Sequence, residues 1–527
     1  MIEFYERLKN DFNEFLENQK KKYPEDELLK IDLHCHDYNS DVPDELLGRI
    51  LNVPETWLKT DALVNELDGN KCDVITITNH NNTRSCYELL EKGRDVLTGA
   101  EFSCFVPDYN IGIHVLAYGF NHKQESVLNK LRKNIYQFQE YTCRENIPTI
   151  WAHPLYHYTS NGVPPFDFFR KLVLLFERFE VINGQRDTWQ NMMVKAWLEK
   201  TDKKTLDSYA AEFEIDIFRY CRNPYLKVFA GGSDSHIGLF AGVTGSYLHV
   251  PRLKERLRAE KGSDLALEAL RNGRIIPFGS VNNSEKLTIA LLDYVFQIAM
   301  NYKDPGLIRL LLHKGTTRDK IISLIASNGF SEVQRHKTTM HFIKLFHDCL
   351  MGVSPSFAKK LMVPRIYKPI FRDAIEMAET NRSRKEDIVQ IYHKSIIQIN
   401  EKLNKILFSR LNKKLTVYFN ENKGYNANIN TLLSGFELPS VIRAYIEPEK
   451  PDITDLNNID FRKLFDGLPF PFFALSLILS ATYASSRAMY NTRPLLSLFA
   501  KETGNYVHPE RVLWLSDTFD DNNGVSM

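Results

Sequence analysis

Two short segments far apart in the chain each carry an alternating pair of side chains that can bind a metal ion. The first is His34-Cys35-His36 and the second is Asp234-Ser235-His236, and each follows a short apolar run. In a β-strand, residues i and i+2 point to the same face. The outer two side chains of each triplet would therefore aim at a common point.

Further imidazole and carboxylate groups lie between these two segments, in or at the end of β-rich runs. They belong to His80, Glu101, His114 and His153. Groups of this kind, gathered in one place, form sites for divalent transition metals. The sequence thus predicts a metal centre, and its histidine-rich composition favours Zn, Mn or Fe over Mg.

A centre of this composition is suited to the hydrolysis of phosphate esters. Two divalent ions about 3.5–4 Å apart lower the pKa of a bridging water to near neutral and hold both the attacking and the leaving oxygen. No side-chain nucleophile is then needed. The sequence has no Cys-x5-Arg loop that would supply one.

The elements that must position these residues alternate between strands and helices. Short β-rich runs occur at 30–35, 73–79, 95–102, 111–119, 147–152, 178–183 and 226–233, and helical patterns separate most of them. Seven such strands predict a mostly parallel sheet, either open or closed into a barrel. Most candidate ligands sit at the C-terminal ends of the strands, where such folds build their active sites.

The ordered ligand set resembles the polymerase and histidinol phosphatase (PHP) family of metal-dependent phosphoesterases. The resemblance covers roughly residues 30–280 and rests on His34, His36, Ser40, Asp41, His80, Glu101, His114, His153, Asp234 and His236. It implies an α/β fold, a distorted seven-stranded (β/α) barrel, with two or three divalent metal ions at its C-terminal mouth. The family often has Asp at the position of Asn79, directly before His80. This departure could alter how the ligand histidine is oriented, but it removes no ligand.

The resemblance also implies how the ligands are shared. The first metal would take His34, His36, Glu101 and Asp234, the second Asp41, His80 and His236, and the third Glu101, His114 and His153. Asp37 could compete with Asp41, which is preferred because it follows Ser40 as in the family motif. Since every ligand position is filled by a competent residue, a catalytic site is favoured over a structural one.

Two arginines are candidates for binding the phosphate of a substrate. Arg186 follows a strand and could bind a phosphate bidentately, and Arg84 lies shortly after His80. A surface ion pair is the alternative for either arginine. His157 is interpreted as a supporting or exposed group.

The chain is predicted to have four parts. Residues 1–28 form an amphipathic helix with an apolar face of Phe4, Leu8, Phe12, Phe15 and Leu16. Residues 29–285 form the barrel and residues 286–505 a mostly α-helical domain. Within residues 506–527, the stretch Val512–Ser526 resembles the opening strand and glycine turn of a retaining GT-B glycosyltransferase. The chain would carry no nucleotide-sugar site of such an enzyme. A strand that packs on the helical domain is the alternative.

Composition excludes some classes of function. A net charge of +1 argues against a broad surface for nucleic acid or membrane. Seven cysteines without paired spacing favour reduced thiols in the cytoplasm, and the N-terminus has no apolar signal core. The uncharged stretch 468–486 is interpreted as a buried helix of a soluble domain and not a membrane span, because it begins with Pro469 and Pro471 and holds several Ser and Thr.

The sequence therefore predicts a cytoplasmic metal-dependent phosphoesterase that acts on a phosphorylated small molecule. Hydrolysis of a phosphodiester in nucleic acid is an alternative, disfavoured by the near-neutral charge and by the absence of basic-aromatic tracts. A third possibility is a non-catalytic, metal-stabilised platform linked to a glycosyltransferase partner.

Overall fold

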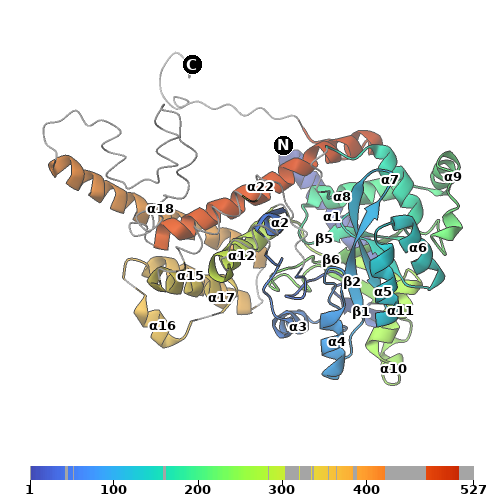
Figure 1. Cartoon of the computed structure of the whole chain (residues 1–527), viewed down its shortest axis with the longest axis horizontal. Helices are drawn as coiled ribbons and strands as arrows, with labels where there is room; N and C mark the ends of the chain where they lie inside the picture. The colour runs from blue at the N-terminus through green and yellow to red at the C-terminus, as the bar shows by residue number, and fades with distance from the viewer. Residues whose placement is uncertain are drawn as a thin grey trace, which may run out of the picture.

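The computed structural model describes residues 2–41, 46–51, 53–157, 162–282, 284–302, 320, 334, 337–353, 355–363, 365–383, 388–421 and 470–509. Strands and their surrounding helices, from the first half of the chain, form one group of elements (Figure 1). Helices from the second half gather beside them, and the long helix α22 (Phe470–Thr503) runs from one group to the other.

The larger sheet has five strands and mixed direction. Its order is β2 (Gly99–Val106), β3 (Ile111–Tyr118), β4 (Thr149–Trp151), β5 (Arg178–Asn183) and β6 (Val228–Gly232). The pairs β2–β3 and β3–β4 are antiparallel, whereas β4–β5 and β5–β6 are parallel. The C-terminal ends of the parallel strands lead directly into ligand-bearing segments.

A second, antiparallel sheet has the order β1 (Leu28–Ile31), β7 (Gly245–His249) and β8 (Ile275–Phe278). Four single bridges connect the remaining segments: Ile31 with Val74, Ile75 with Val96, His80 with Glu101, and Cys35 with Ser235. The structure is thus mixed α/β, as predicted. However, the described residues do not form the continuous seven-stranded ladder of a closed barrel.

Side-chain hydrogen bonds give a physical reason for these missing ladders. Asp73 accepts from the amide of Lys30 at 2.7 Å, and Thr78 Oγ1 accepts from the amide of Cys35 at 3.1 Å. Polar side chains of this kind compete with backbone carbonyls for amide donors. The segments near the ligands, predicted as regular strands at 73–79 and 95–102, are therefore irregular over most of their length up to β2.

Helices cover the sheets and close an apolar core. They are α2 (Leu46–Leu51), α3 (Thr60–Gly69), α4 (Arg84–Glu91), α5 (His122–Leu131), α6 (Ile135–Arg144), α7 (Phe166–Leu172), α8 (Thr188–Glu199), α9 (Lys203–Glu212), α10 (Leu253–Arg256) and α11 (Gly262–Arg271). Trp151 on β4 is fully buried, and its ring lies 5.5 Å from that of Phe176 and 6.1 Å from that of Phe179. This core holds rigid the strand ends from which the ligand side chains project.

The N-terminal helix α1 (Ile2–Lys20) is amphipathic, as its residue pattern predicts. Leu8, Phe12 and Phe15 are buried in the same core as the strands, and the ring of Phe15 lies 5.9 Å from that of Phe229 on β6. The helix therefore belongs to the packing of the first group of elements.

The second group contains α12 (Glu285–Asn301), α15 (Lys337–Leu350), α16 (Phe357–Met362), α17 (Lys368–Ser383), α18 (Ile388–Glu421) and the first half of α22. Ile343, Phe346, Ile370 and Tyr392 are fully buried in its core. The uncharged stretch near the start of α22 contributes Ala474 and other buried residues to this core. Among the described residues, no helix is both long enough and apolar enough to cross a bilayer.

The second half of α22 packs on the first group. Phe499 is fully buried, and its ring lies 4.7 Å from Phe169 and 5.5 Å from Trp197. Parts of the predicted helical domain, including nearly all of 303–336 and all of 422–469, lie outside the described residues, as does the glycosyltransferase-like stretch Val512–Ser526.

Candidate metal centre

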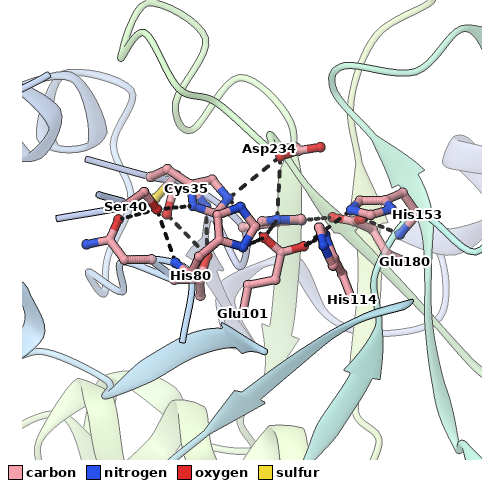
Figure 2. Close-up of polar contacts among 12 residues, drawn as sticks. Cys35, Ser40, His80, Glu101, His114, His153, Glu180 and Asp234 are labelled. Atoms are coloured by element: carbon pink, nitrogen blue, oxygen red, sulfur yellow. Dashed lines mark hydrogen bonds and ion pairs between the residues drawn. The ribbon is translucent and has the colours of Figure 1, made fainter. Parts of the chain in front are cut away.

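Ligand-type side chains from both sheets converge at one place. His34 and His36 follow β1, Glu101 lies in β2, His114 lies in β3, His153 follows β4, and Asp234 and His236 follow β6. His80 comes from the segment bridged to Glu101. Figure 2 shows His80, Glu101, His114, His153 and Asp234 pointing toward one another from separate segments.

Glu101 stands at the middle of the cluster (Figure 2). Its two carboxylate oxygens lie 2.9–3.4 Å from ring nitrogens of His34, His36, His80, His114 and His153. Oε2 faces the first three histidines and Oε1 faces the other two. A carboxylate in this position can bridge two metal ions, as the sequence-based assignment requires.

Asp234 supplies a second carboxylate on the opposite side. Its Oδ1 lies 3.5 Å from His34 Nε2, 3.7 Å from His36 Nε2 and 3.8 Å from His236 Nδ1. Its Oδ2 accepts a hydrogen bond of 3.1 Å from Asn183 Nδ2. One oxygen of Asp234 is thus fixed by the protein while the other faces the histidines.

The donor atoms fit divalent cations. Four groups have potential ligand atoms within 4.8 Å of one another: His36, His80 and His236; His34, His153 and Asp234; His34, His36 and Glu101; and His80, Glu101 and His114. Within the described part of the chain, His34 Nε2, His36 Nε2, His80 Nδ1 and His236 Nε2 are buried without a hydrogen-bond partner. A buried polar atom left in this way is costly, and a bound cation would satisfy each of them.

The backbone is strained at two of the candidate ligands. His153 has φ = 29° and Asp234 has φ = 51°, both in the left-handed region that residues other than glycine seldom adopt. Such conformations persist where the surrounding structure imposes them, and they concentrate at functional sites. The strain therefore indicates that these two turns belong to a functional site.

A buried carboxylate outside the predicted set holds two of the histidines. Glu180 Oε1 lies 2.8 Å from His34 Nδ1, and Oε2 accepts hydrogen bonds of 2.8 Å from the amide of His153 and from Asn183 Nδ2. This contact directs His34 Nε2 toward the centre. Carboxylates that orient ligand histidines in this way also raise their basicity.

Gly232 permits this contact because it has no side chain. A Cβ atom at that position would lie 2.4 Å from His34 Cβ and 2.6 Å from Glu180 Oε1. Both distances are far below van der Waals contact. The glycine that precedes Ser233-Asp234 is thus required by the close approach of the first and last ligand segments.

Electrostatics keep the central carboxylates charged. Burial alone would raise the pKa of Glu101, but His34, His114 and His80 outweigh burial and hold that pKa well below its usual range. Burial likewise opposes a charge on His34, yet Glu101, Glu180 and Asp234 raise its pKa well above the ordinary value. The buried carboxylates of the cluster are negatively charged, and buried negative charge needs positive charge close by.

Asp41 is not placed with the other predicted ligands. Its side chain is 51% exposed and forms an ion pair of 2.8 Å with Arg84. The reason is local: Arg84, at the start of α4, also donates to the carbonyl of Asn39 at 2.8 Å and so holds the turn that carries Asp41 away from the centre.

Glu55 occupies the position expected for Asp41. It is buried, and its Oε2 lies 2.9 Å from His80 Nε2 and 3.6 Å from His236 Nε2. Burial would raise the pKa of Glu55, but His80 and His236 lower it well below the usual value. Glu55 is thus a charged carboxylate beside the two histidines assigned to the second metal.

Asp37, the rival candidate, has a different role. Its carboxylate accepts hydrogen bonds of 2.7 Å from Asn79 Nδ2, 2.8 Å from Ser85 Oγ and 2.7 Å from Thr60 Oγ1. The carboxylate is therefore bound within the protein. Asn79, where the family often has Asp, serves as a donor in this network.

The two candidate phosphate-binding arginines differ in position. Arg186 is buried at the centre, with its guanidinium carbon 3.4 Å above the ring of Tyr156 and Nη2 3.6 Å from Asp234 Oδ2. Arg84 does not line the cavity described below. His157 is a supporting group, since its Nε2 lies 2.8 Å from the carbonyl of Pro154 and its ring packs on Phe168.

The centre opens into a cavity that both halves of the chain enclose. Its lining residues from the first half are Glu55, His80, Glu101, His114, His153, Tyr156, Gln185, Arg186, Asp234 and His236. Leu287, Ala290, Leu291 and Tyr294 of α12 form the remaining wall. The helical part of the chain therefore contributes directly to the site.

Comparison with known proteins adds little to this geometry. No protein-family profile matches the sequence, and no curated protein matches it. One solved structure that resembles the chain is a Bifidobacterium adolescentis protein proposed to be a metal-dependent phosphoesterase. The identity is 12% and the TM-score 0.26, over 41% of this chain and 89% of that one. A likeness this small carries no weight for function.

Proposed function

We propose that the chain is a metal-dependent phosphoesterase of the PHP type, acting on a phosphomonoester. The observation that supports this most strongly is the central position of Glu101, whose carboxylate lies within 3.4 Å of five histidines. A buried carboxylate surrounded in this way is what a bridged metal centre requires.

We further propose that the two sheets belong to one distorted seven-stranded barrel, spanning residues 29–285. The four single bridges support this, because they link the segments in the order that such a ring needs: 31 to 74, 75 to 96, 80 to 101, and 35 to 235. The short ladders between them reflect competition from polar side chains.

The residues proposed as ligands keep the sharing that the family resemblance implies, with one carboxylate exchanged. His34, His36, Glu101 and Asp234 would hold one ion, His80, His236 and Glu55 a second, and Glu101, His114 and His153 a third. Glu55 replaces Asp41 in this set. Divalent ions at this site would supply Lewis-acid activation of water and of the phosphoryl group. Whether they are Zn, Mn or Fe stays a prediction.

Arg186 is proposed to orient the substrate. Its guanidinium lines the cavity beside Asp234 and is held against Tyr156. Arginine is suited to bind two phosphoryl oxygens at once because its donors lie in one plane. Fixing the phosphate against the ligand cluster lowers the barrier by positioning.

Side-chain nucleophiles are not part of the proposal. Cys35 is the cysteine nearest the ligands in sequence, but its Sγ donates to the carbonyl of Thr76 at 3.3 Å. Burial raises the pKa of the Cys35 thiol well above its ordinary value. A thiol in that state is a poor nucleophile, which leaves water as the attacking group.

The phosphodiesterase alternative has less support. Arg186 is the only lysine or arginine among the described residues that line the cavity. A strand of nucleic acid carries a phosphate at every step and needs several cations along its path. The association with a glycosyltransferase and a location in the cytoplasm stay predictions.

The full chain, loaded with Mn²⁺ or Zn²⁺, should release inorganic phosphate from a generic phosphomonoester. Glu101→Gln should lower kcat at least about 100-fold, since it removes the bridging charge. Glu14→Gln, on the exposed side of α1, is the matched control and should leave the rate unchanged. Full activity of Glu101→Gln would overturn the proposal. So would a chain that binds neither Mn²⁺ nor Zn²⁺ and shows no turnover.

A further inference from the structure

Helix α12 has two apolar faces. One face contains Ile289, Leu292, Phe296 and Ala299, which are buried in the core of the helical group. The other contains Leu287, Ala290, Leu291 and Tyr294, which line the cavity of the metal centre. Figure 1 shows α12 lying where the two groups of elements meet.

The second face is a continuous stripe. Positions 287, 290, 291 and 294 follow the i, i+3, i+4, i+7 spacing that places residues on one side of a helix. Leu287, Ala290 and Leu291 remain half-buried and line the cavity, although Ala290 and Leu291 also pack against the helical core and Tyr294 is buried against Leu51 and Val53. A helix that only needed to close a polar site would be expected to present polar side chains there.

The opposite wall of the cavity is charged. It contains the carboxylates of Glu55, Glu101 and Asp234, several histidines and the guanidinium of Arg186. One arginine beside a metal centre provides for one phosphate group. A second charged group on a substrate would have to lose its water against leucine and alanine, which is strongly unfavourable.

We propose that the substrate is a phosphomonoester whose alcohol portion is uncharged and apolar, an alkyl or aryl group. The phosphate lies against the ligand cluster and Arg186, and the apolar group lies on the Leu287–Ala290–Leu291–Tyr294 stripe. This assignment rests on the proposed phosphoesterase function and specifies its substrate class. Sugar phosphates and nucleotides bind less tightly because the α12 wall presents mainly alkyl side chains, Leu287, Ala290 and Leu291, to their hydroxyl groups, bases or second charges.

Competitive inhibition separates binding on the stripe from leaving-group chemistry. The assay measures hydrolysis of a generic phosphomonoester by the Mn²⁺-loaded full chain in the presence of methyl-, butyl- or hexylphosphonate, or of phosphonoacetate. The inhibition constant should fall with chain length, by up to about fourfold for each methylene that is buried. Phosphonoacetate, which carries a second charge, should bind no more tightly than methylphosphonate.

Two substitutions on the stripe sharpen the test. Leu291→Ala should weaken hexylphosphonate about tenfold or more while leaving methylphosphonate unchanged. Ala290→Leu should shorten the longest chain that still gains affinity, because it fills the space that the chain occupies. Val295→Ala, which packs against the helical core and does not line the cavity, is the matched control.

The outcomes distinguish the inference from the proposed function. Absence of turnover with every phosphomonoester overturns the phosphoesterase itself. Turnover with inhibition constants that do not depend on chain length, or that favour phosphonoacetate, overturns the apolar substrate class alone. A Leu291→Ala chain that weakens all phosphonates equally does the same. If that variant fails to fold, as judged by circular dichroism, the wild-type series and Ala290→Leu decide.

Discussion

Loss of the Glu55 carboxylate tests the metal centre more sharply than loss of any residue predicted from sequence. Glu55 Oε2 lies 2.9 Å from His80 Nε2. Two unit charges at that separation interact by about 6 kcal/mol at an effective dielectric of about 20. A Glu55→Gln chain keeps a carbonyl oxygen of similar shape, so only part of this energy is lost.

The expected result is weaker binding of one ion. Loss of a group that only orients a metal-binding histidine already costs about 10–100-fold in affinity, which is about 1.4–2.8 kcal/mol, and loss of the charge of a proposed ligand such as Glu55 should cost at least as much. Isothermal titration of the metal-free protein with Mn²⁺ or Zn²⁺ measures both the number of ions and their dissociation constants. Ions bound through His34 and His114 should be little affected, because Glu55 contacts neither histidine among the described interactions.

Asp41→Asn is the matched control. Asp41 is half exposed and pairs with Arg84. Exposed pairs of this kind contribute at most about 1 kcal/mol to stability, and the substitution should leave metal binding unchanged. If Asp41→Asn loses an ion and Glu55→Gln does not, the assignment of Glu55 is wrong and the position implied by the family motif is right.

Two further substitutions test the packing that supports the site. Gly232→Ala should destabilise the protein by about 1–3 kcal/mol and weaken metal binding, because a Cβ would lie 2.4 Å from His34 Cβ. Urea unfolding and metal titration together measure these two effects. Unchanged values would contradict the close approach of the two segments. Phe499→Ala should cost about 3–5 kcal/mol of unfolding free energy, since the ring is fully buried against Phe169 and Trp197; a loss below about 1 kcal/mol would mean that α22 does not anchor on the first group.

Most of the ligand set could be predicted because its members follow strands. His34 and His36, or Asp234 and His236, are two residues apart after apolar runs, from which strand period predicts that each pair shares a side. In the structure each pair flanks the single bridge between Cys35 and Ser235, and Asp234 is in the left-handed region. The alternation of strands and helices then indicates that the strand ends meet. The sequence pattern therefore contains the approximate site even though the ladders between the strands are shorter than expected.

Glu55 could not be found in the same way. It lies in Pro54-Glu55-Thr56, a loop with neither strand nor helix periodicity, and the family motif pointed to Asp41 instead. What holds Glu55 in place is tertiary packing: Leu51 and Val53 are buried against Tyr294 of α12. A contact between segments that far apart in sequence leaves no mark in local residue spacing.

Glu180 did carry a sequence signal. It stands in Arg178–Asn183, a strand in which every residue is buried. A carboxylate within such a strand needs a buried partner, and here the partners are His34 and the amide of His153. An acidic residue inside a fully buried strand of an α/β protein can thus indicate a residue that supports a metal centre.

The boundary predicted at residue 285 stays a prediction, and the site does not respect it, because helix α12 beyond that residue lines the cavity. Helix α12 begins at that boundary, walls the cavity and packs against the loop that carries Glu55. The helix is apolar on two faces, and each apolar face of a helix must be covered. One side is covered by the helical core, so the other had to meet either the strands or a ligand. The half-buried Leu287 and Leu291 line the cavity on that side. A chain cut off before α12 would therefore lose one wall of the cavity and the support of Glu55, even with every predicted histidine still present.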